Sequence, residues 1–436
     1  MTPSFAVGLE ALKALPEMLR ERLRVAGSLA DQLGMPLFLV GGAARDALLG
    51  TPTTDADLVV EGDGPGYAGR LAGAFNGTIR RHSRFGTATV TPGDGAGIDV
   101  AMARSEWYPA PGALPVVRPG TITEDLGRRD FTINAIAIRL NEIQAGEIVD
   151  PYDGVGDLRR GLIRILHAKS FVDDPTRLFR AVRFEQRLAF QLEERTERLY
   201  RNAVTMGWID RLSGYRLGEQ LRLLFEEANP WQGLRRLSEL GALRAVHTAA
   251  ITDDDVQLAF RMLDRNRFSV TPVYTPIWPL YLLALCRNMP DASLAALTTR
   301  LRPGCELERA LLDLPAMRHL AQQIVEGQAD TPSAFYKKAK GVSHETVALF
   351  ALADPRPTVR QRCEGYLVRD RHIHLAIDGH TLADLGIPPG PVYSRLLEQV
   401  LMDKLDERIK SADEERAWAL KLSMRLREAE DQTEGR

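Results

Sequence analysis

Residues 36–60, PLFLVGGAARDALLGTPTTDADLVV, decide the fold of the N-terminal part of the chain. The apolar run 36–40 ends at two glycines, which predicts a short buried strand, a tight turn and a helix starting near Ala43. Backbone N–H groups at Gly41 and Gly42 can approach an anion closely, and the positive end of the helix points to the same place. The turn therefore predicts a phosphate site.

Asp55 and Asp57 open the second apolar run, residues 58–60. In a strand, the period of two puts both carboxylates on one face, close enough to share metal ions. Such a pair suits Mg²⁺ held against a nucleoside triphosphate. An isolated Asp-x-Asp is more often a solvated turn, but the order of strand, Gly-Gly-x-x-Arg-Asp and Asp-x-Asp strand resembles the first motif of nucleotidyltransferases with a polymerase-β-like palm.

Length, charge and cysteine content limit the class of protein. The chain has 436 residues, enough for about three domains, and its net charge of −2 means that any nucleic-acid site must be local. Three cysteines, Cys286, Cys305 and Cys363, have no metal-ligand or redox spacing, which favours a reduced, cytoplasmic location. No long uncharged apolar segment predicts a membrane span, and residues 6–34 predict an amphipathic helix.

A third carboxylate and a long irregular segment follow. Residues 87–91 and 98–101 predict strands, and the second carries Asp99. In a palm of the polymerase-β type, a carboxylate on a neighbouring strand would face the first two, and Asp99 is the candidate; a loop-edge aspartate is the alternative. Residues 104–126 are rich in Pro and Gly and predict a loop, either functional or a simple surface excursion.

The most specific string in the chain is RRDFTINA, residues 128–135. Two arginines can neutralise a triphosphate, and an aspartate can accept a ribose hydroxyl, although Arg-Arg-Asp alone is a surface charge cluster. With the earlier motifs, the string resembles a signature of class II tRNA nucleotidyltransferases and bacterial poly(A) polymerases. The resemblance implies that the triphosphate is cradled by Gly41, Gly42, Arg45, Arg128 and Arg129, and that the ribose is fixed by Asp130 and Asn134.

The segment FVDDPTRLFRAVRFEQRLAF begins at residue 171 and predicts a helix. Asp174 precedes a proline, which is typical of a helix N-cap. Asp174 and Arg177 share a face near the helix start, and Arg180 and Arg183 continue along it. A carboxylate accepts from the amine of cytosine or adenine, and a guanidinium donates to the ring acceptors, so the pair could select C or A without a template.

This segment resembles the family's Glu-Asp-x-x-Arg motif, which gives the base-selecting role to Asp174 and Arg177, with Asp173 in place of the usual glutamate. Residues 150–158 resemble the third motif, which joins the catalytic head to a helical neck. Residues 213–221 resemble the fifth, a buttressing helix on which Arg216 and Glu219 can pair. Residues 378–391 resemble the tail segment of the family.

The resemblance implies an α+β fold, with a polymerase-β-like nucleotidyltransferase head built on a mixed sheet and an all-α neck, body and tail. The expected boundaries are 1–158 for the head, 159–230 for the neck with the nucleotide-selecting helix, 231–345 for the body and 346–436 for the tail that binds tRNA.

The implied activity is template-independent addition of C, A or both, from CTP and ATP, to the 3′ end of tRNA. Asp55 and Asp57, with Asp99, would act through Mg²⁺ by two-metal phosphoryl transfer. The enzyme would recognise the shape of the acceptor and TΨC arm. Three points stay open: whether the product is CCA, CC or terminal A, whether loop 107–123 supports the C-to-A switch, and the oligomeric state. Poly(A) polymerase and an inactive tRNA-binding protein are the rivals.

Overall fold

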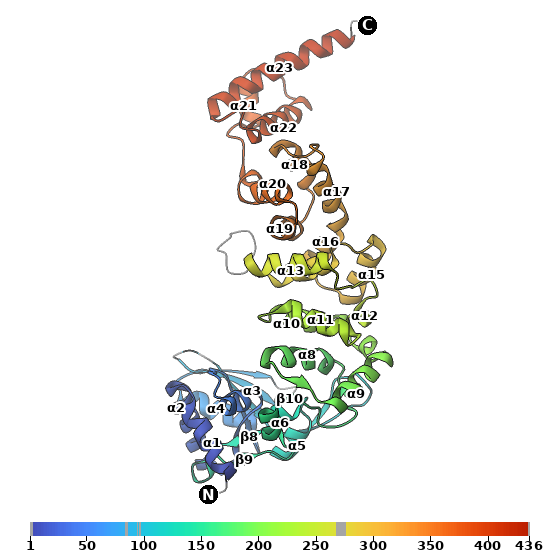
Figure 1. Cartoon of the computed structure of the whole chain (residues 1–436). Coiled ribbons are helices and arrows are strands. Elements are labelled where there is room, and N and C mark those ends of the chain that lie inside the picture. Colours follow the sequence, from blue (N-terminus) through green and yellow to red (C-terminus); the bar gives the residue numbers. More distant parts are fainter. Residues whose placement is uncertain (1–2, 83–85, 94, 96, 267–275, 435–436) are drawn as a thin grey trace. The chain divides into compact units, whose positions relative to one another are not determined.

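The structure is a computed structural model that describes residues 3–82, 86–93, 95, 97–266 and 276–434 (Figure 1). It divides into two compact units. The first comprises Met1–Arg216 with Glu239–Val246, and the second comprises Leu217–Ser238 with His247–Arg436. The first unit contains a large β-sheet and the second is helical.

The elements of the first unit are, in chain order, α1 (Pro3–Ala14), α2 (Glu17–Gln32), β1 (Leu37–Val40), α3 (Gly41–Leu49), β2 (Ala56–Val60), α4 (Gly64–Ala74), β3 (Thr78–His82), β4 (Thr87–Thr91), β5 (Ile98–Met102), β6 (Arg104–Trp107), β7 (Val116–Pro119), α5 (Ile122–Gly127), η2 (Thr132–Asn134), β8 (Ala137–Arg139), η3 (Glu142–Gln144), β9 (Ile148–Val149), α6 (Gly154–Arg160), β10 (Leu162–Ile163), α7 (Ser170–Asp173), α8 (Thr176–Leu188), β11 (Gln191–Leu192), α9 (Glu194–Thr205), η4 (Trp208–Arg211) and α12 (Ala242–Val246).

Seven of these strands form one mixed sheet in the order β3-β4-β5-β2-β1-β8-β9. Strands β2 and β5 are parallel, and the other neighbouring pairs in the sheet are antiparallel. In the parallel pair, Asp57 lies opposite Asp99. The prediction of a mixed-sheet, polymerase-β-like head followed by helices is confirmed.

Side chains of the central strands alternate between two buried clusters. Leu39 and Leu58 belong to a cluster shared with the first four helices, which are blue in Figure 1. Phe38 and Val59 belong to a smaller cluster that includes residues of α5. Because side chains in a strand alternate, Asp57 lies on the same face of the sheet as Val59, away from the helical layer.

The helix predicted over residues 6–34 is two helices, α1 and α2. Pro16 separates them, with a ψ of 142° that belongs to extended backbone. Proline lacks an N–H group and its ring collides with the preceding turn, so a continuous helix is disfavoured at this position. The sequence predicts one helix because residues 6–34 alternate apolar and charged positions at helical spacing.

Residues 104–126 are not the loop that the sequence predicts. Strands β6 and β7 form an antiparallel hairpin with Trp107 opposite Val116, and α5 follows directly. The N–H of Glu124 donates to the Thr121 hydroxyl, while the Thr121 N–H donates to the Glu124 carboxylate, which makes a capping box. The two strands have four residues each, too few to display a clear period among prolines and glycines.

The third motif ties α6 to the RRDFTINA segment. Asp150 accepts hydrogen bonds from the first two N–H groups of α6. The buried Asp157 accepts from the Thr132 hydroxyl at 2.7 Å and from Arg164 Nε at 2.9 Å. Burial by itself would raise the pKa of Asp157, but hydrogen bonds from Arg164, Arg160 and Thr132 outweigh it and lower that pKa.

We expect Asp157→Asn to lower the free energy of unfolding by about 2 kcal/mol at neutral pH, because buried donors lose their charged acceptor. A lowered folded-state pKa means that the carboxylate contributes stability above its unfolded pKa, near about 4, and that this contribution is lost as pH falls through the folded value. The difference in free energy of unfolding between wild type and Asp157→Asn should therefore become smaller below about pH 4. Urea unfolding at pH 7, 5 and 3.5 measures it.

Asp153→Asn is the matched control. Asp153 pairs with the same Arg160, but its side chain is 69% exposed, so the substitution should change stability by less than about 1 kcal/mol. If the difference in free energy of unfolding between wild type and Asp157→Asn were as large at pH 3.5 as at pH 7, the lowered pKa of Asp157 would be contradicted.

The elements of the second unit are α10 (Gly214–Phe225, which begins in the first unit), α11 (Pro230–Glu239), α13 (Asp254–Asn266), α14 (Trp278–Cys286), α15 (Asp291–Leu301), α16 (Cys305–Leu312), α17 (Leu314–Val325), α18 (Pro332–Ala339), α19 (His344–Ala353), α20 (Pro357–Val368), η5 (Asp370–His372), α21 (Gly379–Asp384), α22 (Val392–Leu405) and α23 (Ala412–Glu434).

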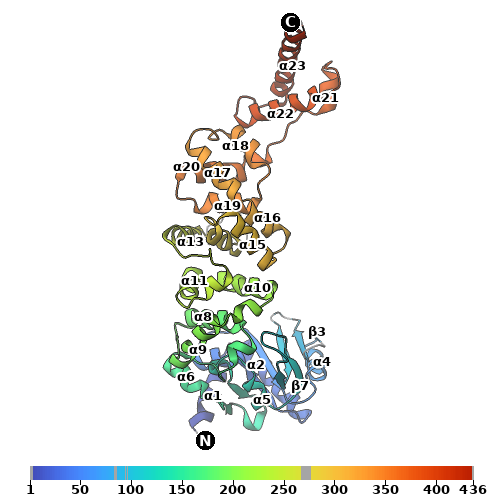
Figure 2. The same cartoon turned by 90° about the vertical axis from the view of Figure 1, so that its right-hand side faces the viewer.

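The second unit is built around helices that are apolar on all sides. Helices α14 and α19 are buried along nearly their whole length and pack against each other. Arg287, directly after α14, donates to the Ala353 carbonyl and to Asp354 beyond α19. Helices α17, α18 and α20 pack together farther along the chain (Figure 2). The four-part division into head, neck, body and tail stays a prediction.

Two further expectations concern the whole chain. Within the described residues, no helix is both long and apolar enough to cross a membrane. Cys286, Cys305 and Cys363 are all free, and only Cys305 is exposed.

Candidate active site

The turn between β1 and α3 places two adjacent glycines at a helix N-terminus. Helix α3 begins at Gly41, two residues before the predicted start. Gly41 has a φ of +64°, and a Cβ there would lie 2.9 Å from Nη1 of Arg129, so a side chain would be both strained and obstructed. Arg45, in the first turns of α3, is buried and donates to Oδ1 of Asn134 at 2.7 Å.

A cavity of about 470 Å³ opens beside this turn. Its walls come from α3, the start of β2, the β6 hairpin, the RRDFTINA segment and α8. The lining residues are Gly41, Gly42, Ala43, Arg45, Asp46, Asp55, Asp57, Glu106, Tyr108, Arg128, Arg129, Asp130, Asn134, Asp174, Arg177, Arg180, Phe184 and Arg187. The structure therefore brings the predicted phosphate, metal, ribose and base residues to one cavity.

Two of the three predicted carboxylates, Asp55 and Asp57, line this cavity, and Asp99 does not. Asp57 is at the start of β2, Asp55 directly precedes the strand, and Asp99 is opposite Asp57 on β5. Asp99 accepts from the Thr89 hydroxyl at 2.7 Å and lines a neighbouring cavity that also includes Asp57. Burial raises the pKa of Asp57, and the negative charges of Asp99 and Asp55 raise it further against the opposing charges of nearby arginines.

This donor set fits a divalent cation. Mg²⁺ is commonly held by one or two carboxylates and completes its octahedron with water and substrate phosphates. Asp55 and Asp57 supply two such carboxylates, and a bound cation would relieve the repulsion that raises the pKa of Asp57. In the described part of the chain, no three acidic, histidine or cysteine side chains are grouped as a metal site. Asp99 lies beside Asp57 on the neighbouring strand β5.

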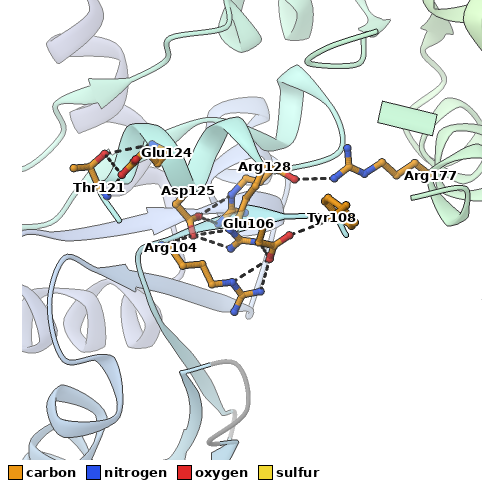
Figure 3. A network of polar contacts seen from close by, with 9 residues as sticks. Arg104, Glu106, Tyr108, Thr121, Glu124, Asp125, Arg128 and Arg177 are labelled. Carbon is orange, nitrogen blue, oxygen red and sulfur yellow. Dashed lines mark hydrogen bonds and ion pairs between the residues drawn. The ribbon is translucent and has the colours of Figure 1, made fainter. Parts of the chain in front are cut away.

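A buried aspartate holds the two arginines of the RRDFTINA segment. Asp125 is fully buried on α5 and accepts from Arg128 Nη2 at 2.7 Å and from Arg129 Nη2 at 2.9 Å. Burial alone would raise the pKa of Asp125, but Arg129 and Arg128 outweigh it and lower that pKa. Arg128 also donates to Glu106 of β6, and Glu106 accepts from Arg104 (Figure 3).

Asp130 and Asn134 form the next layer of the wall. Asp130 accepts from Asn134 Nδ2 at 3.0 Å and from Arg180 Nε at 2.7 Å. Burial would raise the pKa of Asp130, but the charge of Arg180 and the hydrogen bond from Asn134 lower it. Arg45, Asn134, Asp130 and Arg180 therefore form one continuous chain of hydrogen bonds from α3 to α8.

The side chains of the predicted base-selecting residues, Asp174 and Arg177, do not bond to each other, although the Arg177 N–H donates to the Asp174 backbone carbonyl at 3.0 Å. Oδ1 of Asp174 accepts from the Thr176 N–H at the start of α8 and from Arg216. Arg177 is buried and donates to the Ser170 hydroxyl at 2.6 Å and to the Arg128 carbonyl at 2.7 Å. The prediction of Asp174 as N-cap and Pro175 as first helical residue is wrong by one position, because Pro175 is the N-cap residue and α8 begins at Thr176. Asp174 still accepts from the first N–H group of that helix.

The predicted pair of Arg216 with Glu219 is wrong. Arg216 donates to Asp174 at 2.7 Å and to the Gly112 carbonyl at 2.8 Å. Glu219 accepts instead from Arg222, which also bonds to Glu226. The i, i+3 spacing allowed either partner, and no local pattern reveals a contact across 42 residues of sequence.

Helical periodicity explains which residues of α8 line the cavity. At 3.6 residues per turn, Phe184 and Arg187 share a face with Arg177 and Arg180. The sequence prediction includes Arg177 and Arg180. It leaves out Phe184 and Arg187, which the same helical spacing could have found. Arg183 was predicted to line the site but is not among the lining residues, because it lies beside this face. Two further missed residues, Glu106 and Tyr108, lie on the hairpin that was predicted as loop.

The chain resembles proteins of one family along nearly its whole length. Residues 37–164 match the model of the poly A polymerase head domain. An A-adding tRNA nucleotidyltransferase of Geobacter sulfurreducens is 37% identical over 94% of this chain, which spans 48% of that relative. A CC-adding tRNA nucleotidyltransferase of Deinococcus radiodurans is 34% identical over 87% of this chain and 87% of its own length.

Solved structures are similar in fold as well. The CCA-adding enzyme of Thermotoga maritima, determined as a complex with tRNA, aligns with a TM-score of 0.73 and 32% identity. The alignment covers 94% of this chain and 97% of that one. The chain therefore spans about half the length of one curated relative and nearly all of this solved enzyme.

Proposed function

Since the chain belongs to the class II tRNA nucleotidyltransferases, we propose that it adds C, A or both to the 3′ end of tRNA, using CTP and ATP and no nucleic-acid template. One observation carries the proposal. The residues for phosphate, cation, ribose and base lie around a single cavity of about 470 Å³. We also propose that the tRNA body is recognised by shape, through the helices beyond the head, and that the protein works in the cytoplasm.

In this proposal, different residues of the cavity wall bind the triphosphate, the ribose and the base of the nucleotide. Arg45, Arg128 and Arg129, with the N–H groups at Gly41 and Gly42, bind the triphosphate. Asp130 and Asn134 orient the ribose, and Asp174 and Arg177 read the base. Asp55 and Asp57, next to Asp99, would hold Mg²⁺, which lowers the pKa of the attacking 3′-hydroxyl and offsets charge on the departing pyrophosphate. Asp125 keeps the two adjacent arginines oriented before substrate arrives.

The product is tested with three tRNA substrates that end before CCA, after the first C and after CC. We expect magnesium-dependent incorporation of C, of A or of both in a defined number of steps, read by sequencing the 3′ ends. Incorporation of only C would assign a CC-adding enzyme, and extension of only the CC-ending tRNA would assign an A-adding enzyme.

The same assay separates the rivals. A tail that keeps growing with ATP alone would favour poly(A) polymerase. Binding of tRNA without incorporation of any nucleotide would favour an inactive tRNA-binding protein, and would contradict the proposal.

A further inference from the structure

The two oxygens of the Asp174 carboxylate have different surroundings. Oδ1 accepts three hydrogen bonds, from the Thr176 N–H at 3.0 Å, the Thr176 hydroxyl at 2.6 Å and Arg216 Nη2 at 2.7 Å. Across residues 3–82, 86–93, 95, 97–266 and 276–434, no protein group donates to Oδ2. Asp174 lines the cavity and Arg216 does not. The protein therefore occupies one oxygen completely and leaves the other as an acceptor.

Arg216 also holds the connection between the two hairpin strands. Its Nη1 donates to the Gly112 carbonyl at 2.8 Å, and the Gly112 N–H donates to the Asp173 carbonyl at 3.2 Å. Gly112 has a φ of +71°, and a Cβ there would lie 3.1 Å from Cβ of Arg211. The connection between β6 and β7 is therefore held through the N–H and the carbonyl of Gly112. The positive φ and the close contact at this position favour glycine.

A purely structural role for Arg216 would not require hydrogen bonds to both Asp174 and Gly112. Arg216 is on the same helix as Glu219, within reach by spacing, yet that glutamate pairs with Arg222. The guanidinium instead forks between a carboxylate oxygen and a backbone carbonyl, and its planar, rigid geometry fixes both acceptors relative to each other. This geometry controls where the second carboxylate oxygen points.

We propose that Arg216 is a positioning residue for base selection, which with Thr176 fills Oδ1 of Asp174 and presents Oδ2 to the exocyclic amine of an incoming cytosine or adenine. The inference rests on the proposed function and deepens it. A carboxylate oxygen held in place favours bases that donate and repels the keto oxygens of uracil and guanine. Through Gly112, the same side chain couples the hairpin connection to the orientation of the base-reading group.

The test compares kcat/KM for the preferred nucleotide with that for UTP or GTP, in wild type, Arg216→Gln and Arg216→Lys. We expect Arg216→Gln to lower this selection ratio by about tenfold or more, with an unchanged KM for tRNA. Arg216→Lys should restore part of the ratio, because an ammonium can still donate to Oδ1 but cannot fork to both acceptors. Arg222→Gln, on the same helix but outside the contacts of Asp174, is the matched control and should keep the wild-type ratio.

Gly112→Ala tests the coupling without changing a charge. It should lower the selection ratio in the same direction, and the double variant with Arg216→Gln should lose little more than the larger single loss, since both act on one contact. An equal loss of incorporation for all four nucleotides in Arg216→Gln, at an unchanged selection ratio, would overturn the role of Arg216. That result differs from an inert wild type, which would contradict the proposed function itself.

Discussion

Replacing Asp55 and Asp57 together by alanine is expected to abolish nucleotide incorporation, with a loss of at least about a thousandfold, and to leave tRNA binding close to wild type. Asp55 and Asp57 line the cavity as the proposed cation ligands, and they lie at one end of a sheet whose remaining residues are unchanged. The other carboxylates of the lining pair with arginines, and Asp174 also accepts from the first N–H group of α8. Single-turnover incorporation and a tRNA filter-binding assay measure the two effects separately.

Asp63→Asn is the control for this variant. Asp63 lies after the same strand, accepts from the Gly66 N–H at the start of α4, and can keep this bond as asparagine. Near-normal incorporation by the Asp55→Ala, Asp57→Ala variant would contradict the assignment of the catalytic centre.

Magnesium provides a second readout of the same carboxylates. Burial, together with the charges of Asp99 and Asp55, raises the pKa of Asp57. A cation that binds the folded carboxylate pair and not the unfolded chain should offset this repulsion and stabilise the folded protein. At ten times its Kd, a ligand adds about 1.4 kcal/mol to the free energy of unfolding. Melting curves with and without Mg²⁺ should therefore differ for wild type and coincide for the double alanine variant.

The second large effect concerns Asp174→Asn, which is expected to reverse the choice of base. The donors at Oδ1, from Thr176 and Arg216, require an acceptor at that position. The amide oxygen of asparagine would take it, and the amide NH₂ would face the cavity in place of Oδ2. A donor there favours the keto groups of uracil and guanine over the amines of cytosine and adenine, by up to about a hundredfold in kcat/KM.

Competition among the four triphosphates, followed by sequencing of the added nucleotides, measures the reversal. Asp173→Asn is the matched control, because the neighbouring Asp173 does not line the cavity. Unaltered preference for C or A in Asp174→Asn would show that the base is read elsewhere.

The parts of the site that could be predicted from sequence are those formed by residues close together in the chain. The β1 turn, the strand that carries Asp57 and the buried apolar residues of RRDFTINA follow from patterns of neighbouring residues. Two details differ: α3 begins two residues before its predicted start, and Asp55 precedes the strand in which the sequence places it. The convergence of these segments on one cavity is consistent with the motifs, but it depends on strand order in the sheet. Helical spacing from Arg177 and Arg180 also points to Phe184 and Arg187, which the sequence prediction leaves out, and it does not point to Arg183, which the prediction includes.

The errors share a physical cause. The β6–β7 hairpin has short strands, and its Glu106 is fixed by Arg128, a residue 22 positions away. Arg216 bonds across 42 residues to Asp174 and across 104 to Gly112. Such contacts are decided by tertiary packing, and neither propensity nor periodicity encodes them. The break at Pro16, by contrast, was local and could have been predicted from the proline itself.

The parallel pairing of β2 with β5 has a consequence for the order in which the protein assembles. Parallel neighbours need a crossover, and here the chain passes through α4, β3 and β4 before β5 returns beside β2. A nascent chain that has emerged only through Val60 carries the phosphate turn and the two aspartates, but has no strand to bring Asp99 beside Asp57. The repulsion between Asp99 and Asp57 can therefore arise only after β5 has been made and has paired with β2. A fragment limited to residues 37–60 would hold the motif without the reaction centre.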